Sequence, residues 1–375
     1  MNNNQRRENR YQRRKAEREA KRIAKSKSCG DFKDVFSYEN LFESGKQCAR
    51  GVGWKSSTQA YIDRLPVNIY RSYEALHDGS YKSKGFIEFN IMERGKKRHI
   101  RSVHISERVV QKVLCEKVLV PIYTDTLIYD NGASQKGKGT DFSMNRLTCH
   151  LQRHHRKHGN NGYVLLMDFK SYFDTIPHSV IYKENDKRLH DDKVRKIANQ
   201  FMEDFGDVGL GLGSQISQTY ALLVASSIDH FVKEKLHIKG YARYMDDCYL
   251  LHHDKEYLQY CYSEIKKKCE GMGLRLNEKK SVIVPISKGF KFLKTKFTLT
   301  ETGKVYRKMN PQGSQIMRSK LKVFRRWVDE GRFTLEDVEC AFQSYLGHMK
   351  RGDSYNKIQQ MEKFYKELFP ERTRA

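Results

Sequence analysis

The chain has 375 residues and a net charge of +26, from 71 Lys and Arg against 45 Asp and Glu. This length allows two or three domains or one large enzyme. No apolar run approaches the roughly 20 residues that span a bilayer, which excludes a membrane protein. The excess of positive charge indicates a polyanionic partner, and nucleic acid is the first candidate.

The start of the chain is strongly basic. Residues 1–28 hold eleven Lys or Arg against three Glu and almost no aliphatic side chain. This composition favours helix but cannot form a core, so we expect residues 1–35 to be a solvated, partly helical arm that binds RNA. A solubilising tail is the alternative. The absence of an apolar segment excludes a secretory signal, and the eight scattered cysteines indicate reduced thiols in a cytoplasmic setting.

The folded part is expected to begin near Phe36. Apolar spacing predicts helix over residues 58–80, and alternation of apolar and polar side chains predicts a β-hairpin over residues 85–103. An amphipathic helix is predicted over residues 106–120, and Pro121 should end it. The chain has no repeat and no linker rich in Pro, Gly or Ser, which indicates one continuous enzyme.

Three aspartates carry the strongest chemical signal. Residues 162–168 form an apolar strand pattern that ends on Asp168, and residues 240–251 predict two short strands joined at Asp246 and Asp247. Adjacent carboxylates repel each other and resist desolvation unless they share a cation. A surface Asp-Asp turn is the alternative, but the flanking apolar strands argue against it. Oxygen ligands favour Mg²⁺, with Mn²⁺ as a substitute, and two such ions can catalyse nucleotidyl transfer.

Other segments add nucleic-acid features. His150, His154 and His158 fall on one face of a predicted helix, where they suit either a metal or, because basic residues surround them, a nucleic acid. A glycine-rich loop over residues 209–214 precedes another predicted helix. Residues 311–369 predict further helices with apolar stripes and basic faces, which suits binding to a duplex through its shape and phosphates.

The motifs together resemble those of reverse transcriptases. Tyr244-Met245-Asp246-Asp247 matches their Y-M-D-D signature, and residues 168–174 look like their first aspartate motif. The order and spacing agree across about residues 85–300. The resemblance implies an α+β right-hand polymerase with an antiparallel palm sheet. The N-terminal arm would cover residues 1–35, the fingers and palm residues 36–300, and the helical thumb residues 301–375.

The resemblance also implies catalytic roles. Asp168, Asp246 and Asp247 would bind two Mg²⁺ ions, and Phe169 would add its backbone carbonyl. Lys280 would protonate or neutralise the leaving pyrophosphate. For Lys280 an ordinary surface lysine is the alternative.

Further residues would contact the nucleotide. Arg101 and Lys138 would hold the triphosphate, although they could equally grip template phosphates. Phe173 would crowd a ribose 2′-hydroxyl and so favour deoxynucleotides, with a core Phe as the alternative. Leu212 and Gln218, in the third palm motif, would lie near the template base or incoming nucleotide.

That third motif departs from the usual Pro-Gln-Gly form, since Gly211 and Leu212 stand where Pro and Gln are common. With the Ser217-Gln218 pair, it resembles the reverse transcriptases of diversity-generating retroelements, which are associated with error-prone copying. Residues 289–294 resemble the primer-grip hairpin, with Lys294 in place of the usual Gly.

Expected partners are an RNA template, a DNA or RNA primer, dNTPs and an accessory protein for RNA or target recognition. A phage-defence or retron-like reverse transcriptase, an RNA-dependent RNA polymerase and a non-catalytic RNA-binding module are the alternatives.

Overall fold

A computed structural model describes residues 3–93 and 95–370 of the chain. It divides into two compact units, each formed by several segments of the sequence. Unit 1 comprises Met1–Tyr129, Phe169–Phe231 and Ile265–Leu276, and unit 2 comprises Asp130–Asp168, Val232–Glu264 and Asn277–Ala375. None of the helices in the described residues is both long and apolar enough to cross a membrane.

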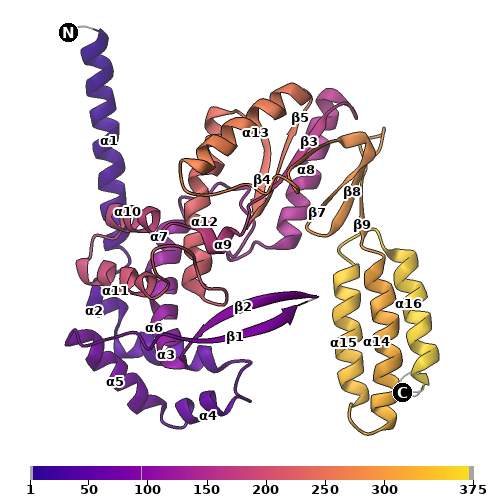
Figure 1. Ribbon diagram of the computed structural model, residues 1–375, viewed down its shortest axis with the longest axis horizontal. Helices are drawn as coiled ribbons and strands as arrows, with labels where there is room; N and C mark the ends of the chain where they lie inside the picture. The colour runs from indigo at the N-terminus through magenta and orange to yellow at the C-terminus, as the bar shows by residue number, and fades with distance from the viewer. Residues whose placement is uncertain (1–2, 94, 371–375) are drawn as a thin grey trace. The chain divides into compact units, whose positions relative to one another are not determined.

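Unit 1 begins with the basic helix α1 (Asn3–Lys27), of which only Ser26 is buried within the described residues (Figure 1). Its last turns attach it to the unit, because the Ser26 hydroxyl accepts a hydrogen bond from the backbone N–H of His190 at 3.1 Å. Lys25 also pairs with Asp125 at 2.7 Å. The segment expected to be a partly helical arm is therefore a helix over nearly its whole length.

Short helices follow, and they form the first part of the unit 1 core. Buried Phe32 and Val35 lie just before the expected start of the folded part at Phe36. The helix predicted over residues 58–80 is divided in two by a turn at Asp63 and Arg64. The helices are α2 (Phe32–Val35), α3 (Tyr38–Ala49), α4 (Ser56–Ile62) and α5 (Leu65–His77).

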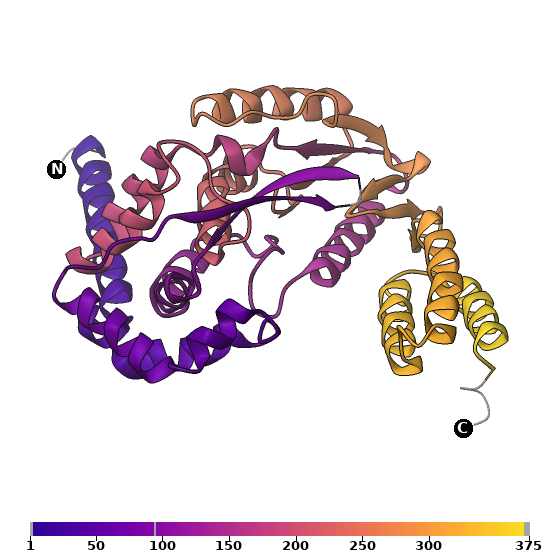
Figure 2. The same ribbon diagram turned by 60° about the horizontal axis from the view of Figure 1, so that its bottom comes forward.

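The predicted hairpin is confirmed. Strands β1 (Phe86–Glu93) and β2 (Lys96–Val103) pair antiparallel from Phe86 opposite Val103 onward, and they form two long adjacent ribbons in Figure 2. They are longer than expected, because segments assigned to the turn belong to the strands.

Pro121 does not end the next helix, contrary to the prediction. Helix α6 (Ile105–Leu114) continues through a π-helical turn (Cys115–Leu119) into α7 (Val120–Thr124). The π turn changes the hydrogen-bond register, so Pro121 falls in the first turn of a new segment. The proline thus stands near the start of the segment that follows the π turn, a position where proline is tolerated better than inside an unbroken α-helix.

The rest of unit 1 is helical and surrounds the glycine-rich loop. Helix α12 confirms the helix predicted after that loop, but it is buried on most of its circumference and not on a single face. Its core position comes from packing against α6, α7 and the π turn between them. The helices of this part are α9 (Tyr172–Thr175), α10 (His178–Arg188), α11 (Asp192–Glu203) and α12 (Gln215–His230).

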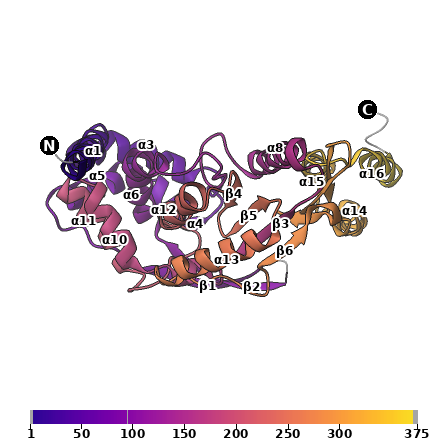
Figure 3. The same cartoon turned by 90° about the horizontal axis from the view of Figure 1, so that it is seen from above.

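Unit 2 is built on a four-stranded antiparallel sheet in the order β4-β5-β3-β6 (Figure 3). The strand predicted to end on Asp168 and the pair joined at Asp246 and Asp247 are all present. Helix α8 (Thr140–His158) packs against β4 and β5. The strands are β3 (Tyr163–Asp168), β4 (Gly240–Tyr244), β5 (Asp247–His252) and β6 (Val282–Pro285), and α13 (Lys255–Glu270) follows β5.

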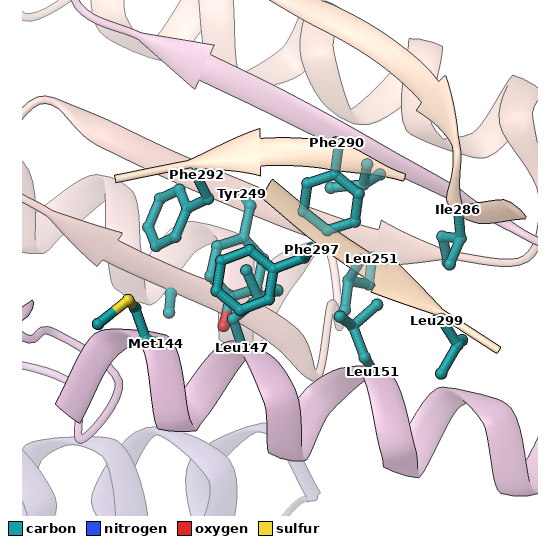
Figure 4. Close-up of a cluster of buried hydrophobic side chains, with 12 residues drawn as sticks. Met144, Leu147, Leu151, Tyr249, Leu251, Ile286, Phe290, Phe292, Phe297 and Leu299 are labelled. Atoms are coloured by element: carbon teal, nitrogen blue, oxygen red, sulfur yellow. The ribbon is translucent and has the colours of Figure 1, made fainter. Parts of the chain in front are cut away.

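A second, three-stranded sheet packs on α8 and the first sheet. It consists of β7 (Phe290–Phe292), β8 (Thr295–Leu299) and β9 (Val305–Met309) in that order, which confirms the predicted hairpin and adds a strand. Figure 4 shows Phe297 above Leu147 of α8, with the ring of Tyr249 beside them. All three are fully buried, so this cluster holds α8 and both sheets together.

The predicted C-terminal helices are also confirmed. Helices α14 (Gln312–Asp329), α15 (Leu335–Met349) and α16 (Tyr355–Leu368) form a bundle with its own core, visible in yellow in Figure 2. The rings of Phe342 and Tyr365 stack at 4.2 Å in that core. Arg351 pairs with Asp141 of α8 at 3.1 Å, which ties the bundle to the rest of unit 2. The residues after 370 lie outside the described part of the chain.

Candidate active site

The three predicted aspartates meet at one end of the four-stranded sheet. Asp168, the last residue of β3, lies opposite Asp247, the first residue of β5. Asp246 occupies the turn between β4 and β5, where Met245 has a left-handed φ of +54°. The fully buried guanidinium of Arg243 donates to the Met245 carbonyl at 3.1 Å and so supports this turn. Antiparallel pairing places side chains of facing residues within a few ångströms.

Burial and like charge act together on these carboxyl groups. Burial is the main cause that raises the pKa of Asp247 to about 6, and the charges of Asp246 and Asp168 raise it further. Burial, and then the Asp168 carboxylate, raise the pKa of Asp246 as well. Asp168 itself is 4% exposed. Ionisation of Asp246 and of Asp247 is thus opposed by the neighbouring carboxylates, which is a typical arrangement of a cation site.

Two lysines partly offset this repulsion. The Lys280 ammonium contacts Asp168 Oδ2, and this hydrogen bond raises the pKa of Lys280. The charge of Lys294 opposes the rise of the Asp247 pKa, so this lysine also acts on the site. Lys280 therefore lies among the aspartates as expected from the sequence, where it can approach a ligand bound to them.

The carboxylates fit a hard divalent cation. Asp168 Oδ1 is buried and has no hydrogen-bond partner among the described residues. An unpaired buried carboxylate oxygen is costly unless a cation or donor reaches it. Within the described part of the chain, no three His, Cys, Asp or Glu side chains already converge as a ligand group. A bound ion would instead compete with the Lys280 ammonium for Asp168.

An ionic network around the buried Asp130 lies beside the same sheet and was not predicted. Asp130 accepts hydrogen bonds from Arg146 at 2.6 Å and Lys233 at 2.9 Å, and His150 lies 3.5 Å away. Its backbone carbonyl also accepts from the Arg243 N–H at 3.2 Å. Burial opposes ionisation of Asp130, but these hydrogen bonds outweigh it and hold its pKa well below the usual range. The network therefore anchors β4, which leads into Asp246.

Nothing near Asp130 in the sequence signals this role. Asp130 stands in a polar Tyr-Asp-Asn-Gly segment that is typical of a turn, and the partners of its carboxylate lie up to 103 residues away. Arg243 offered a better signal, because a charged residue inside an apolar strand pattern must find buried partners.

Phe169 and Phe173 lie in unit 1. Phe169 is 4% exposed, and its backbone forms a bridge with Leu276. Phe173 is half-buried, and its carbonyl accepts a hydrogen bond from the Leu210 N–H at 2.7 Å. A backbone hydrogen bond therefore joins the segment after Asp168 to the glycine-rich loop. Phe169 and Phe173 nevertheless belong to unit 1, whereas the three aspartates belong to unit 2.

Leu212 and Gln218 also lie in unit 1, near the start of α12. Leu212 is half-buried in the loop, and Gln218 is exposed in the first turn of the helix. Gly211 is required there, because a Cβ atom would lie 2.3 Å from the ring of Phe205. The adjacent Ser217 is fully buried. The loop thus has a tightly packed backbone that leaves Leu212 part-exposed, and the helix that follows exposes Gln218.

The two predicted triphosphate ligands fall in different units. Arg101, on β2 in unit 1, pairs with Glu88 of β1 at 3.1 Å. Lys138, in unit 2, donates to the Asn131 carbonyl at 3.1 Å, and burial lowers its pKa. Only Lys138 therefore shares a unit with the aspartates.

The comparison with protein families decides the assignment. The family model described as reverse transcriptase (RNA-dependent DNA polymerase) matches residues 83–297, more than half of the chain. The chain belongs to the reverse transcriptase family. The mixed helix and sheet architecture with antiparallel sheets is accordingly the right-hand polymerase fold that the resemblance implied.

Solved structures similar to this reverse transcriptase include two telomerases. Telomerase from Candida albicans, in complex with the TWJ fragment of telomeric RNA, is 14% identical with a TM-score of 0.46, over 74% of this chain and 54% of that chain. Apo telomerase from Candida tropicalis is 12% identical with a TM-score of 0.46, over 77% and 62%. The reverse transcriptase thus spans less than two thirds of either telomerase chain. No curated protein matches it.

Substitution of Asp130 should reveal the ionic network through its pH dependence. Asp130→Asn removes the buried carboxylate that pairs with the part-buried Arg146 and Lys233, so we expect a loss of about 2 kcal/mol in unfolding free energy at pH 7. The folded pKa of Asp130 lies below its unfolded value, so the wild type loses this stabilisation as the pH falls below about 4.

Urea unfolding at pH 7 and pH 3 measures the difference between the two proteins, which should shrink at pH 3. Asp63→Asn, at an exposed position, is the matched control and should change stability little at either pH. An equal loss for Asp130→Asn at both pH values would contradict the network.

Proposed function

We propose that this chain is an RNA-directed DNA polymerase that copies an RNA template into cDNA by two-metal nucleotidyl transfer. The observation that carries the proposal is the set of three aspartates at one sheet end in a reverse transcriptase, with a buried Asp168 oxygen that lacks a partner. The expected partners are an RNA template, a DNA or RNA primer, dNTPs and an accessory protein, and the expected location is the cytoplasm.

The proposed mechanism assigns each residue a separate task. Asp168, Asp246 and Asp247, with the Phe169 carbonyl, would hold two Mg²⁺ ions. Such ions activate a primer 3′-hydroxyl and stabilise the leaving pyrophosphate. Burial and neighbouring carboxylates raise the pKa of Asp246 and Asp247, so a bound cation would favour the ionised form of both groups. Lys280 would give up its contact with Asp168 and neutralise charge on the pyrophosphate.

The remaining predicted residues would select and hold the nucleotide. Arg101 and Lys138 would contact its phosphates, and Phe173 would exclude a ribose 2′-hydroxyl. Exclusion by a ring is steric, so it works without a hydrogen bond and requires only that the ring stay in place. The fixed backbone of Phe173, bonded to Leu210, supports such a role.

Removal of one aspartate tests the proposed activity. Asp246→Ala should reduce dNTP incorporation on an RNA template by more than about a hundredfold, because a metal ligand is lost. RNA binding should remain. Stability should not fall, because Asp246 sits among like charges that oppose its ionisation.

The assays are Mg²⁺-dependent primer extension, filter binding and thermal unfolding. Asp186→Ala, at an exposed position of α10, is the control and should extend primers normally. Normal dNTP extension by Asp246→Ala would disprove the site assignment. Wild-type extension with rNTPs in preference to dNTPs would favour the alternative of an RNA-dependent RNA polymerase.

Phe173 allows a separate test of sugar selection. Phe173→Val should raise rNTP incorporation relative to dNTP incorporation by about tenfold or more, because the smaller side chain leaves room for the 2′-hydroxyl. Single-nucleotide extension with each substrate measures kcat/KM for both. Tyr182→Val, at a part-exposed aromatic of α10, controls for general loosening of unit 1 and should leave the ratio unchanged. An unchanged ratio in Phe173→Val would make Phe173 a structural residue only.

We further propose that the enzyme belongs to a diversity-generating retroelement. Leu212, at the position usually held by Gln, cannot hydrogen-bond a nucleotide or template base, which would relax base selection. The Ser217-Gln218 pair supports the same subfamily. A template repeat with a near-identical variable repeat beside the gene would support this role, and its absence would shift the interpretation to phage defence or a retron-like element.

Leu212→Gln tests the molecular part of this proposal. The restored amide should lower misincorporation by several-fold on an RNA template, while the rate of correct incorporation stays within about twofold. Sequencing of cDNA made by both proteins measures the error rate. Leu212→Met preserves an apolar side chain of similar volume and should keep the wild-type error rate. Equal error rates for wild type and Leu212→Gln would contradict the proposed role of Leu212.

A further inference from the structure

Unit 2 also has a basic site, which lies at the sheet end opposite the aspartates. A cavity of about 520 Å³ opens between the C-terminal half of α8, the segment before β4 and the end of β5. Its described lining contains four Lys or Arg and six His but no Asp or Glu. The basic residues are Arg153, Arg156, Lys157 and Lys239, and the imidazoles are His150, His154, His158, His237, His252 and His253.

Four of these imidazoles form a continuous row. His154 and His158 of α8 have ring centres 5.1 Å apart, and His158 stacks on His253 at 4.5 Å with planes 9° apart. His253 contacts His252 at 4.4 Å. Two elements far apart in the sequence thus build one aromatic surface, on which His158 and His253 are exposed.

The row is positioned at its inner end by the backbone. His154 Nε2 lies 2.8 Å from the Asn161 carbonyl, which can only accept a hydrogen bond. A Cβ atom on Gly162 would lie 2.4 Å from the same nitrogen, so only glycine admits the ring there. Burial lowers the pKa of His154 and of His252, and the neighbouring imidazoles lower both further.

This arrangement favours an anion. Protonation of His154 and His252 is opposed by burial and by the neighbouring imidazoles, and negative charge in the cavity would offset that opposition. Asp254 is the acidic residue that acts on His252, and its carboxylate already accepts backbone N–H groups at the start of α13. The other charged and titratable groups around the row are Arg153, Arg156, Lys157, Lys239, His150, His237 and Asp254.

We infer that this cavity binds a single-stranded segment of RNA, with Arg156 and Lys157 on its phosphates and the His158–His253 pair stacked on a base. Aromatic and imidazole rings are common platforms for unpaired RNA bases, and cations beside them track the backbone. The occupant is assigned as RNA because the proposed polymerase requires an RNA template. To that extent the inference rests on the proposed function.

The site is separate from the aspartates. Tyr163 pairs with His252 at one end of β3 and β5, and Asp168 pairs with Asp247 at the other. Five residue steps along a strand span about 17 Å. A segment held in the cavity is therefore several nucleotides away from the reacting end of a primer, and it would hold the template outside the copied duplex.

Charge reversal in the cavity tests this inference. The double variant Arg156→Glu/Lys157→Glu should bind a fluorescein-labelled single-stranded oligoribonucleotide about tenfold more weakly, with a shallower salt dependence, because two phosphate contacts are lost. Fluorescence anisotropy is measured with full-length protein already saturated with an unlabelled primer–template duplex. The matched control Lys193→Glu/Lys196→Glu changes the same charge at exposed positions of α11.

The pH dependence separates the imidazoles from the fixed charges. Wild-type affinity for the oligoribonucleotide should rise several-fold as the pH falls from about 7.5 to about 5.5, because a bound phosphate favours protonated His154 and His252. His158→Ala/His253→Ala should bind more weakly, because the platform is lost, while Arg156 and Lys157 remain.

The inference is overturned if the Arg156/Lys157 variant loses no more RNA affinity than the Lys193/Lys196 control. It is also overturned if the Arg156/Lys157 variant loses affinity for an oligodeoxyribonucleotide of the same sequence but keeps its affinity for the RNA. These binding assays need no polymerisation. They therefore distinguish failure of the proposed RNA site from failure of the proposed polymerase activity. The Asp246→Ala protein should bind the oligoribonucleotide as the wild type does, even though it extends no primer.

Discussion

The mutual repulsion of three carboxylates, one buried at Asp168 and two part-buried at Asp246 and Asp247, is the constraint on which the functional end of unit 2 depends. Burial and neighbouring charge raise the pKa of Asp247 to about 6 and also raise that of Asp246. No net gain in stability comes from such a group unless a cation enters. The surrounding structure must therefore hold these side chains in place, and the buried strands around Asp168 provide that rigidity.

The ionic network around Asp130 is part of this support. It uses the opposite arrangement, with one carboxylate among three basic groups, and so it is stable without any ligand. Its backbone bond to Arg243, and the bond from Arg243 to Met245, connect it to the turn that carries Asp246. The Asp130 network, which has its own counter-charges, thus supports the turn that carries Asp246, whose neighbours are carboxylates.

Sequence patterns predicted the elements of this site because their signals are local. A buried apolar run that ends on Asp168, and two strands around Asp246, can be recognised within a few residues. The Asp130 network could not be predicted, since its partners are distant in the sequence. The prediction that Pro121 ends its helix was wrong, because the usual rule for proline assumes an unbroken α-helical register. The π turn before Pro121 changes that register. The left-handed turn at Leu293 and Lys294 shows a hairpin geometry formed without the expected glycine.

The strands β3 and β5 also explain how a chain of net charge +26 keeps an acidic site and a basic site apart. Their six-residue pairing places Asp168 and Asp247 at one end and Tyr163 and His252 at the other. Between the two ends, buried apolar side chains such as Leu165 and Leu250 exclude water and ions. A cation at the carboxylates and a phosphate at the imidazoles would therefore bind at opposite ends of the same pair of strands. The length of the strands, and not a flexible linker, would set the distance between the template contact and the chemistry.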